Sequence, residues 1–185
     1  MHILMGLALA VAAGWNAFLP LIILAFANRL SPRGDIPAPY RALSNPFVIG
    51  ALLLVLSVEI FADKIPGIDA KNDRAGAVYR PLAGAVLMAV ATADMVLPGV
   101  VAAVIGAAVA FGTHLLKVRY RRRVGRVLAG LGHPVASMAE DATSAFVSIL
   151  AVLLPAVGFA LAVAFTALTA WIGGSARDRQ GQAQE

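Results

Sequence analysis

Long apolar runs separated by short polar stretches dominate the chain. The runs cover residues 3–28, 46–62, 81–96, 98–116, 135–153 and 156–172. Most of them approach the roughly 20 residues that a helix needs to cross a bilayer. The pattern therefore predicts an all-α membrane protein with one transmembrane domain over residues 1–174, followed by a disordered polar tail over residues 175–185.

Two of the apolar runs carry the same kind of motif at an offset of 78 residues. Residues 16–20 (NAFLP) interrupt the first run, and residues 94–98 (DMVLP) separate the third run from the fourth. A second pair of matching motifs, at residues 45–46 and 133–134, opens later runs, and each of these runs ends at a proline. This repetition predicts an internal duplication, which in membrane proteins often marks a functional site.

The duplication changes how the first run is interpreted. If it breaks near Gly14 as its counterpart breaks at Pro98, each arm is about 12 residues and about 18 Å long, too short for a hydrocarbon core of about 30 Å. Each unit then becomes a re-entrant helical hairpin followed by one transmembrane helix, over about 3–66 and about 81–155. One crossing per unit makes the second unit an inverted repeat, and residues 156–172 form an extra C-terminal helix.

Composition agrees with the membrane assignment and excludes several classes of function. Apolar residues make up 60% of the chain and charged residues 14%, and the mean hydropathy is +0.82. The basic residues flank apolar runs, where they meet lipid headgroups, so we expect membrane lipids and no nucleic acid as partners. Without cysteine, phosphate loop, zinc motif or nucleophile elbow, we expect no metal, no cofactor and no enzyme activity.

The distribution of lysine and arginine predicts the orientation in the membrane. Twelve of the fifteen fall on one side in the topology above, and three fall on the other. The twelve are Lys64, Lys71, Arg74, Arg80, Lys117, Arg119, Arg121, Arg122, Arg123, Arg126, Arg177 and Arg179. Basic loops stay in the cytoplasm, so we expect a multi-pass protein of the bacterial inner membrane with a cytoplasmic C-terminus.

Asn16 and Asp94 occupy equivalent positions at the tips of the two predicted hairpins. In one interpretation they face each other near the midplane and offer an amide and a carboxylate to a cation, a proton or a polar headgroup. In the other, each side chain caps the helix that begins at its own Leu-Pro step, because Asn and Asp are favoured N-caps. The sequence leaves both interpretations open.

Four further acidic residues lie in or beside apolar runs. Glu59 and Asp63 are four positions apart and share a helix face, and Glu140 and Asp141 lie one to two turns into the run that opens at Pro134. These carboxylates either bind the substrate or relay protons, or they pair with Arg80 and the basic loop to hold the bundle together.

The same residues resemble a known family. Residues 16–20 (NAFLP), 59–67 (EIFADKIPG), 80–84 (RPLAG) and 134–141 (PVASMAED) are similar to the bacterial membrane-protein family named domain of unknown function 4126, over roughly residues 5–165. His133 departs from the asparagine expected before the proline. The resemblance implies that these residues matter, and it implies no activity.

Two functions from different classes are consistent with the sequence. The first is a transporter or flippase-like protein for a small solute, ion or lipid headgroup, with its site at the hairpin tips, working as a homodimer. The alternative is a non-transporting auxiliary subunit of a larger membrane complex, which docks through small-residue faces.

Overall fold

The computed structural model describes residues 2–31, 38–62, 65, 69–127 and 132–174. These residues are helical apart from short connections, so the predicted all-α class is confirmed. The helices are α1 (His2–Trp15), α2 (Phe18–Leu30), the 3-10 helix η1 (Ala38–Ser44), α3 (Pro46–Ala62), α4 (Asp69–Ala91), α5 (Gly99–Val127), α6 (Gly132–Leu153) and α7 (Pro155–Gly174). The predicted tail and Asp63 lie outside the described residues.

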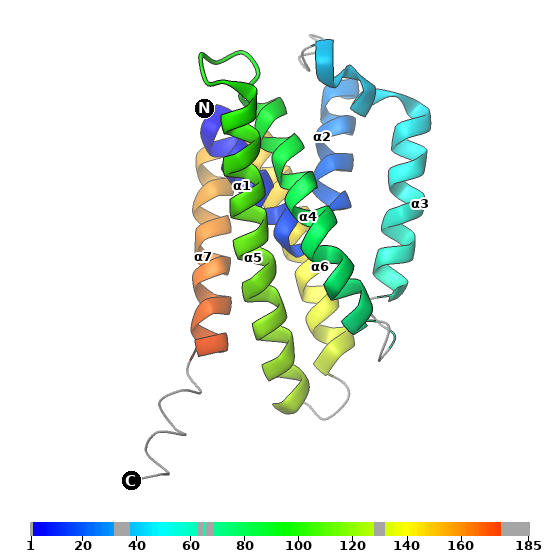
Figure 1. The fold of residues 1–185 in the computed structure, drawn as a ribbon, viewed down its shortest axis with the longest axis vertical. Coiled ribbons are helices and arrows are strands. Elements are labelled where there is room, and N and C mark those ends of the chain that lie inside the picture. Colours follow the sequence, from blue (N-terminus) through cyan, green and yellow to red (C-terminus); the bar gives the residue numbers. More distant parts are fainter. Residues whose placement is uncertain (1, 32–37, 63–64, 66–68, 128–131, 175–185) are drawn as a thin grey trace.

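The α-helices run alternately up and down one bundle (Figure 1). We call the end at which α1 begins the upper end, and the end at which α7 finishes the lower end. Helices α3, α5 and α7 descend from the upper end, whereas α4 and α6 ascend from the lower end. The first and last described helices therefore begin and finish at opposite ends of the bundle.

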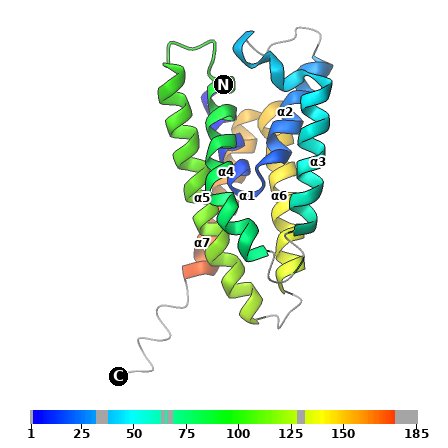
Figure 2. The same ribbon diagram turned by 45° about the vertical axis from the view of Figure 1, so that its right-hand side comes forward.

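Helices α1 and α2 form a hairpin that extends only part of the way along the bundle. They contain 14 and 13 residues, or about 21 Å and about 20 Å at 1.5 Å per residue. The chain descends in α1, turns at Asn16 and Ala17, and climbs back in α2 to the upper end (Figure 2). The predicted interruption of the first apolar run is thus present, and it lies inside the bundle.

The second hairpin differs from the prediction of two short arms. Helix α4 begins at Asp69 rather than near residue 81, and α5 continues to Val127 rather than ending near residue 116. With 23 and 29 residues, they are about 35 Å and about 44 Å long, enough to cross a bilayer. The turn that joins them, including Asp94, consequently lies at the upper end of the bundle and not at its middle.

Helix α1 forms the centre of the bundle. It packs against α4, α5, α6 and α7, and its residues from Ala8 to Trp15 are buried all round, as expected for a helix that is apolar on every face. Glycines allow this close packing. A Cβ atom at Gly84 of α4 would lie 2.5 Å from the carbonyl oxygen of Gly106 of α5. The stripe of Ala102, Gly106 and Ala110 is therefore a packing surface.

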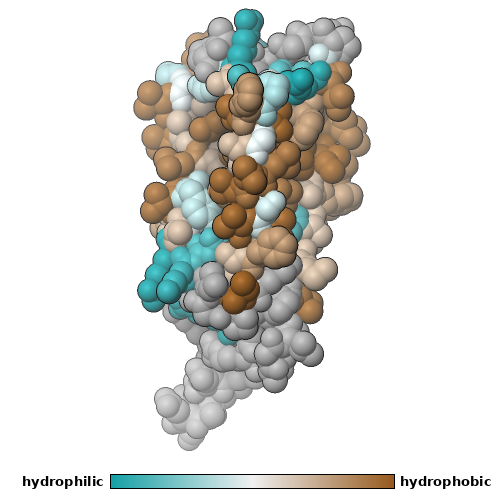
Figure 3. All heavy atoms as spheres, turned by 90° about the vertical axis from the view of Figure 1, so that its right-hand side faces the viewer, coloured by the Kyte–Doolittle hydropathy of each residue, from teal (hydrophilic) through white to brown (hydrophobic). Residues whose placement is uncertain are grey.

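The outer surface is apolar along most of the bundle. Figure 3 shows a broad hydrophobic band between polar residues at the upper end and a polar group lower down on the same face. Exposed Leu54, Val58 and Phe61 of α3 contribute to such surface. Among the described residues, three helices are long and apolar enough to span a membrane, namely Gly99–Val124, Val135–Leu153 and Pro155–Ile172. Together these features indicate a protein embedded in a membrane.

Candidate functional site at the hairpin tip

The tip of the α1–α2 hairpin, residues 15–18, is a polar turn inside the bundle. Asn16 is 1% exposed, and its side-chain Oδ1 accepts hydrogen bonds from the backbone N–H groups of Phe18 at 3.0 Å and Leu19 at 3.1 Å. Ala17 already has helical dihedral angles, φ −70° and ψ −35°, so Asn16 acts as the N-cap of α2. The capping geometry predicted as one of two alternatives is therefore present.

The other end of the same amide contacts a carboxylate on α6. The Nδ2 of Asn16 donates a hydrogen bond to Oδ1 of Asp141 at 3.0 Å. Asn16 thus uses its acceptor to cap α2 and its donor to join the hairpin to α6. Of the six predicted site residues, Asn16 and Asp141 are brought into direct contact, although they are separated by 125 positions in the sequence.

The carbonyl groups at the end of α1 are also satisfied by polar side chains from other helices. The Nζ of Lys117 donates to the carbonyl oxygen of Trp15 at 2.7 Å, and the hydroxyl of Ser144 donates to that of Ala12 at 3.0 Å. Irregular backbone at membrane depth needs such partners, because no water is available there. The lysine ammonium also places positive charge at the negative end of the α1 dipole.

Below the tip lies a charged cluster, which we define as Glu59, Arg80, His114, Lys117, Arg121 and Glu140. All six side chains are at most 3% exposed. Its lower part is centred on Glu140 of α6, which forms an ion pair with Lys117 at 3.1 Å. Glu140 also accepts hydrogen bonds from Nε of Arg121 at 2.9 and 2.8 Å, and it pairs with Nη2 of the same arginine. One carboxylate therefore contacts two cations of α5, and Arg121 also lies 3.6 Å from Asp73 of α4.

The other part of the charged cluster joins α3, α4 and α5. Nη2 of Arg80 donates to Oε1 of Glu59 at 3.0 Å, and Nη1 of Arg80 lies 2.9 Å from Nδ1 of His114. A guanidinium can only donate, so Nδ1 of His114 is unprotonated in this contact. The hydroxyl of Tyr79 also donates to Oε1 of Glu59 at 2.9 Å. Its ring stacks on Phe18 of the hairpin tip, with the ring centroids 5.4 Å apart.

The short hairpin explains why charges gather at this depth. Helices α1 and α2 fill the core only from the upper end to the tip (Figure 2). Glu59 is near the lower end of α3, and Glu140 lies in the first half of the ascending α6. Arg80 lies at the middle of the ascending α4, and Lys117 lies in the second half of the descending α5. Charged side chains therefore occupy the interior below the tip. Buried charges are costly unless they are paired, and here they are paired across helices.

Three buried polar atoms around the tip and the charged cluster have no hydrogen-bond partner within the part of the chain that the structure describes. They are Nε1 of Trp15, Oε2 of Glu59 and Oγ of Ser137. Buried polar groups normally have a partner, so unsatisfied ones mark places where a polar molecule would bind favourably. Over the same described ranges, no group of three His, Asp or Glu side chains is arranged to hold a metal ion.

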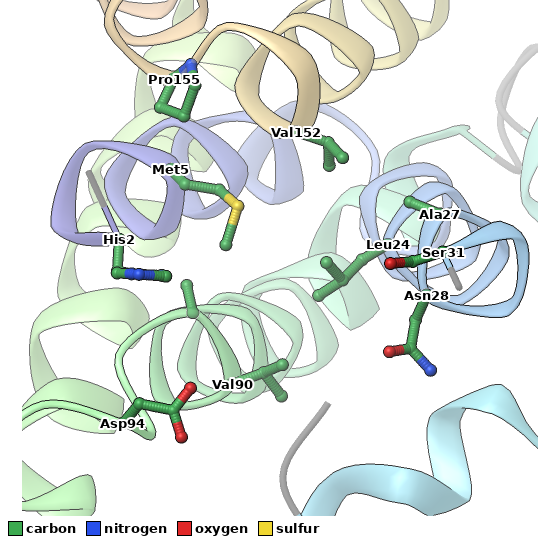
Figure 4. Close-up of a pocket in the computed structure, with 11 residues that line it drawn as sticks. His2, Met5, Leu24, Ala27, Asn28, Ser31, Val90, Asp94, Val152 and Pro155 are labelled. Carbon is green, nitrogen blue, oxygen red and sulfur yellow. The ribbon is translucent and has the colours of Figure 1, made fainter. Parts of the chain in front are cut away.

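The structure does not bring Asp94 to Asn16, so the prediction that they face each other at the midplane is wrong. Asp94 is exposed in the turn between α4 and α5. Its side chain instead helps to line an end cavity of about 380 Å³ at the upper end, between α1, α2, α4 and the α6–α7 junction (Figure 4). The physical reason is the length of α4 and α5, which carries their turn to the bundle end.

Three buried cations of the charged cluster were predicted as cations of the loops. Arg80, Lys117 and Arg121 are buried and ion-paired, so they do not contribute to the charge of the loops. One signal was available in the sequence: positions 114, 117 and 121 follow the i, i+3, i+7 spacing of one helix face. The pairing of Glu59 with Arg80, one of the two predicted alternatives, is present.

Comparison with known proteins gives a family but no activity. No curated protein and no solved structure matches the chain. A family model described as domain of unknown function (DUF4126) matches residues 3–174, which include the hairpin tip, the charged cluster and the residues that line the end cavity except His2. The chain therefore belongs to the DUF4126 family.

Proposed function

We propose that this protein is a membrane transporter or flippase-like protein, not an enzyme, that moves a small solute, an ion or a lipid headgroup. The observation that carries the proposal is the hairpin tip. A polar turn that ends two short helices inside a bundle matches the way transporters build substrate sites from broken helices. The contact between Asn16 and Asp141 supplies an amide and a carboxylate at this point.

The charged cluster supports a polar route from the tip toward the lower end. Lys117 contacts both the tip carbonyl of Trp15 and the carboxylate of Glu140, so a movement at the tip would alter the ion pairs below it. Intramembrane ion pairs of this kind are typical of substrate and proton pathways. In the proposed mechanism the tip separates the charged cluster from the end cavity. The charged cluster opens to one side of the membrane and the end cavity to the other, one at a time.

The proposal also includes a membrane arrangement. Exposed Lys71, Arg74 and Arg119 lie toward the lower end, whereas Arg29 and Arg41 lie at the upper end, so we place the lower end in the bacterial cytoplasm with the C-terminus. The α1–α2 hairpin is then re-entrant. Helices α1 to α3 run opposite to α4 to α6 (Figure 1), which supports an inverted repeat. Because so small a bundle gives little wall around a substrate, we propose a homodimer.

The test is a flux assay on the purified full chain in vesicles of phosphatidylethanolamine and phosphatidylglycerol. The probes are protons, Na⁺, K⁺, inorganic phosphate and a fluorescent phosphatidylethanolamine. We expect at least one probe to move faster than in protein-free vesicles. We also expect Asp141→Asn, which keeps the side-chain shape, to slow that movement by on the order of tenfold.

Two controls keep the flux assay interpretable. Arg119→Gln removes an exposed charge of α5 outside the charged cluster and should leave the flux unchanged. Size-exclusion profiles must show that each variant remains folded in the vesicle preparation. A folded wild-type chain that moves none of the probes, or an Asp141→Asn variant with normal flux, would contradict the proposal and favour an auxiliary subunit.

A further inference from the structure

The end cavity has the size and the walls of a ligand site. Its volume of about 380 Å³ falls in the range of about 300–1,000 Å³ that is usual for small-molecule pockets. Most of its walls are aliphatic, with Met5, Leu24, Val90 and Val152 directed toward its interior in Figure 4. Such walls favour an apolar body in the ligand, because its burial removes hydrocarbon from water.

The described residues that line the end cavity include a carboxylate without a basic partner. Among the residues that the structure describes, Asp94 is the carboxylate of the lining, and neither lysine nor arginine belongs to it. Asp94 forms no hydrogen bond or ion pair with any residue that the structure describes. In Figure 4, His2 and Asp94 lie on one side of the cavity, and Asn28 lies on the other, where it donates to Ser44 at 2.7 Å. Asp94 is thus the group whose charge is left for a ligand.

The start of α1 opposes this negative charge but does not cancel it. Helix α1 begins at His2, beside the cavity, and a helix N-terminus carries roughly half a positive charge. The carboxylate carries a full negative charge, so the field that these described groups set up in the cavity mouth favours a cation. An anion of the same size would meet Asp94 unfavourably, and a neutral hydrocarbon would gain no orientation from it.

We propose that the end cavity binds an organic ammonium ion with an apolar body, either a free amine or the ethanolamine headgroup of a lipid. Asp94 binds the ammonium group, and the aliphatic walls bind the body. This inference adds a substrate class to the proposed function. Its meaning for transport rests on that proposed function. Binding itself can be measured without transport.

The experiment is titration calorimetry on the full chain in maltoside micelles, which carry neither charge nor amine. Benzyltrimethylammonium is compared with phenylmethanesulfonate, an anion of similar shape. We expect saturable binding of the cation and none of the anion. Asp94→Asn should weaken cation binding about tenfold or more, whereas Val96→Asn, in the same exposed turn, adds the same amide without removing charge and should not.

Two further arms complete the test. Ala27→Phe places a ring into the cavity wall and should abolish binding. If the natural ligand is a lipid headgroup, added phosphatidylethanolamine should compete with benzyltrimethylammonium, and phosphatidylglycerol should not. Equal binding of cation and anion, or unchanged binding in Asp94→Asn, overturns the inference. If the cation fails to bind while wild-type flux persists, only this inference falls; if it binds and no flux is found, only the proposed function falls.

Discussion

Asn16 shows how one side chain can serve two roles in a membrane interior. Its oxygen caps α2 and its nitrogen contacts Asp141, so capping and site formation are not exclusive alternatives. A capping serine or threonine would carry its donor and its acceptor on one and the same hydroxyl oxygen. The amide of Asn16 instead places its acceptor and its donor on two atoms, Oδ1 and Nδ2, so that it contacts α2 and α6 at once.

Exchanging the two groups of this contact tests its role. Asn16→Asp keeps the capping oxygen but sets a second carboxylate against Asp141, so we expect a loss of about 1–3 kcal/mol of stability. Asp141→Asn in the Asn16→Asp background restores one amide and one carboxylate and should recover most of that loss. Thermal unfolding of the four proteins in maltoside gives the coupling energy. Additive effects would show that the contact does not matter.

Glu140 is the residue whose charge the bundle needs most. Glu140→Gln leaves Lys117 and Arg121 buried with one fewer counter-charge, which we expect to cost about 3–5 kcal/mol. Arg119→Gln, on the same helix as the two cations but exposed, should change stability by less than about 0.5 kcal/mol. Circular dichroism during heating measures both. Similar unfolding temperatures for the two variants would refute the importance of the buried ion pairs.

At the scale of elements, the close contact of α4 and α5 depends on glycine. The backbones approach at Gly84 and Gly106, and α1 packs on α5 through Gly14. A Cβ at Gly14 would lie 2.7 Å from the carbonyl oxygen of Ala110. These small residues allow the buried part of α1, from Ala8 to Trp15, to fit among four longer helices. Dispersion between close backbones replaces the hydrophobic effect inside a membrane.

Gly84→Ala should therefore separate the two helices. Its Cβ would lie 2.5 Å from both the carbonyl oxygen of Gly106 and the Cβ of Ala110, and we expect a loss of about 2 kcal/mol. Gly112→Ala on α5 meets nothing within 4 Å and should gain up to about 1 kcal/mol from helix propensity. Unfolding temperatures in maltoside distinguish the two. Equal and small effects would mean that the helices yield easily at this contact.

At the scale of the whole molecule, the half-length hairpin divides the bundle in two. The upper half contains a largely apolar core around α1, in which the hydroxyls of Thr92 and Ser148 are also buried, and the lower half contains the charged cluster. The hairpin tip forms the boundary between them. This division places the polar groups in the interior without exposing them to lipid, and the exposed surface of the bundle remains apolar.

Single cysteines can test this arrangement, because the chain contains none of its own. Ala93→Cys and Ala75→Cys mark the two ends of α4 at exposed positions, and His2→Cys marks the start of α1. With an impermeant maleimide on intact spheroplasts, we expect His2→Cys and Ala93→Cys to react and Ala75→Cys to be protected until the membrane is opened. Labelling of His2→Cys together with Ala75→Cys would exclude the re-entrant hairpin.

Local properties of the sequence were sufficient to predict the helices and the interruption of the first one. The run at residues 46–62 matches α3 at both ends, and the break at Asn16 follows from a capping side chain and a nearby proline. Hydropathy also placed Glu59, Glu140 and Asp141 inside the bundle. These features depend on neighbours along the chain, which the sequence contains directly.

Tertiary contacts alone decided the start of α4 and the burial of the cations. The polar residues 69–79 are helical, and within them Asp73 lies 3.6 Å from Arg121 of α5, while Oδ1 of Asn72 lies 3.1 Å from the hydroxyl oxygen of Tyr79. Sequence periodicity does not show whether Lys117 faces solvent or Glu140. That outcome depends on partners from other helices. Contacts between helices also set the length of α4 and α5, and this length places Asp94 at the end cavity, away from Asn16.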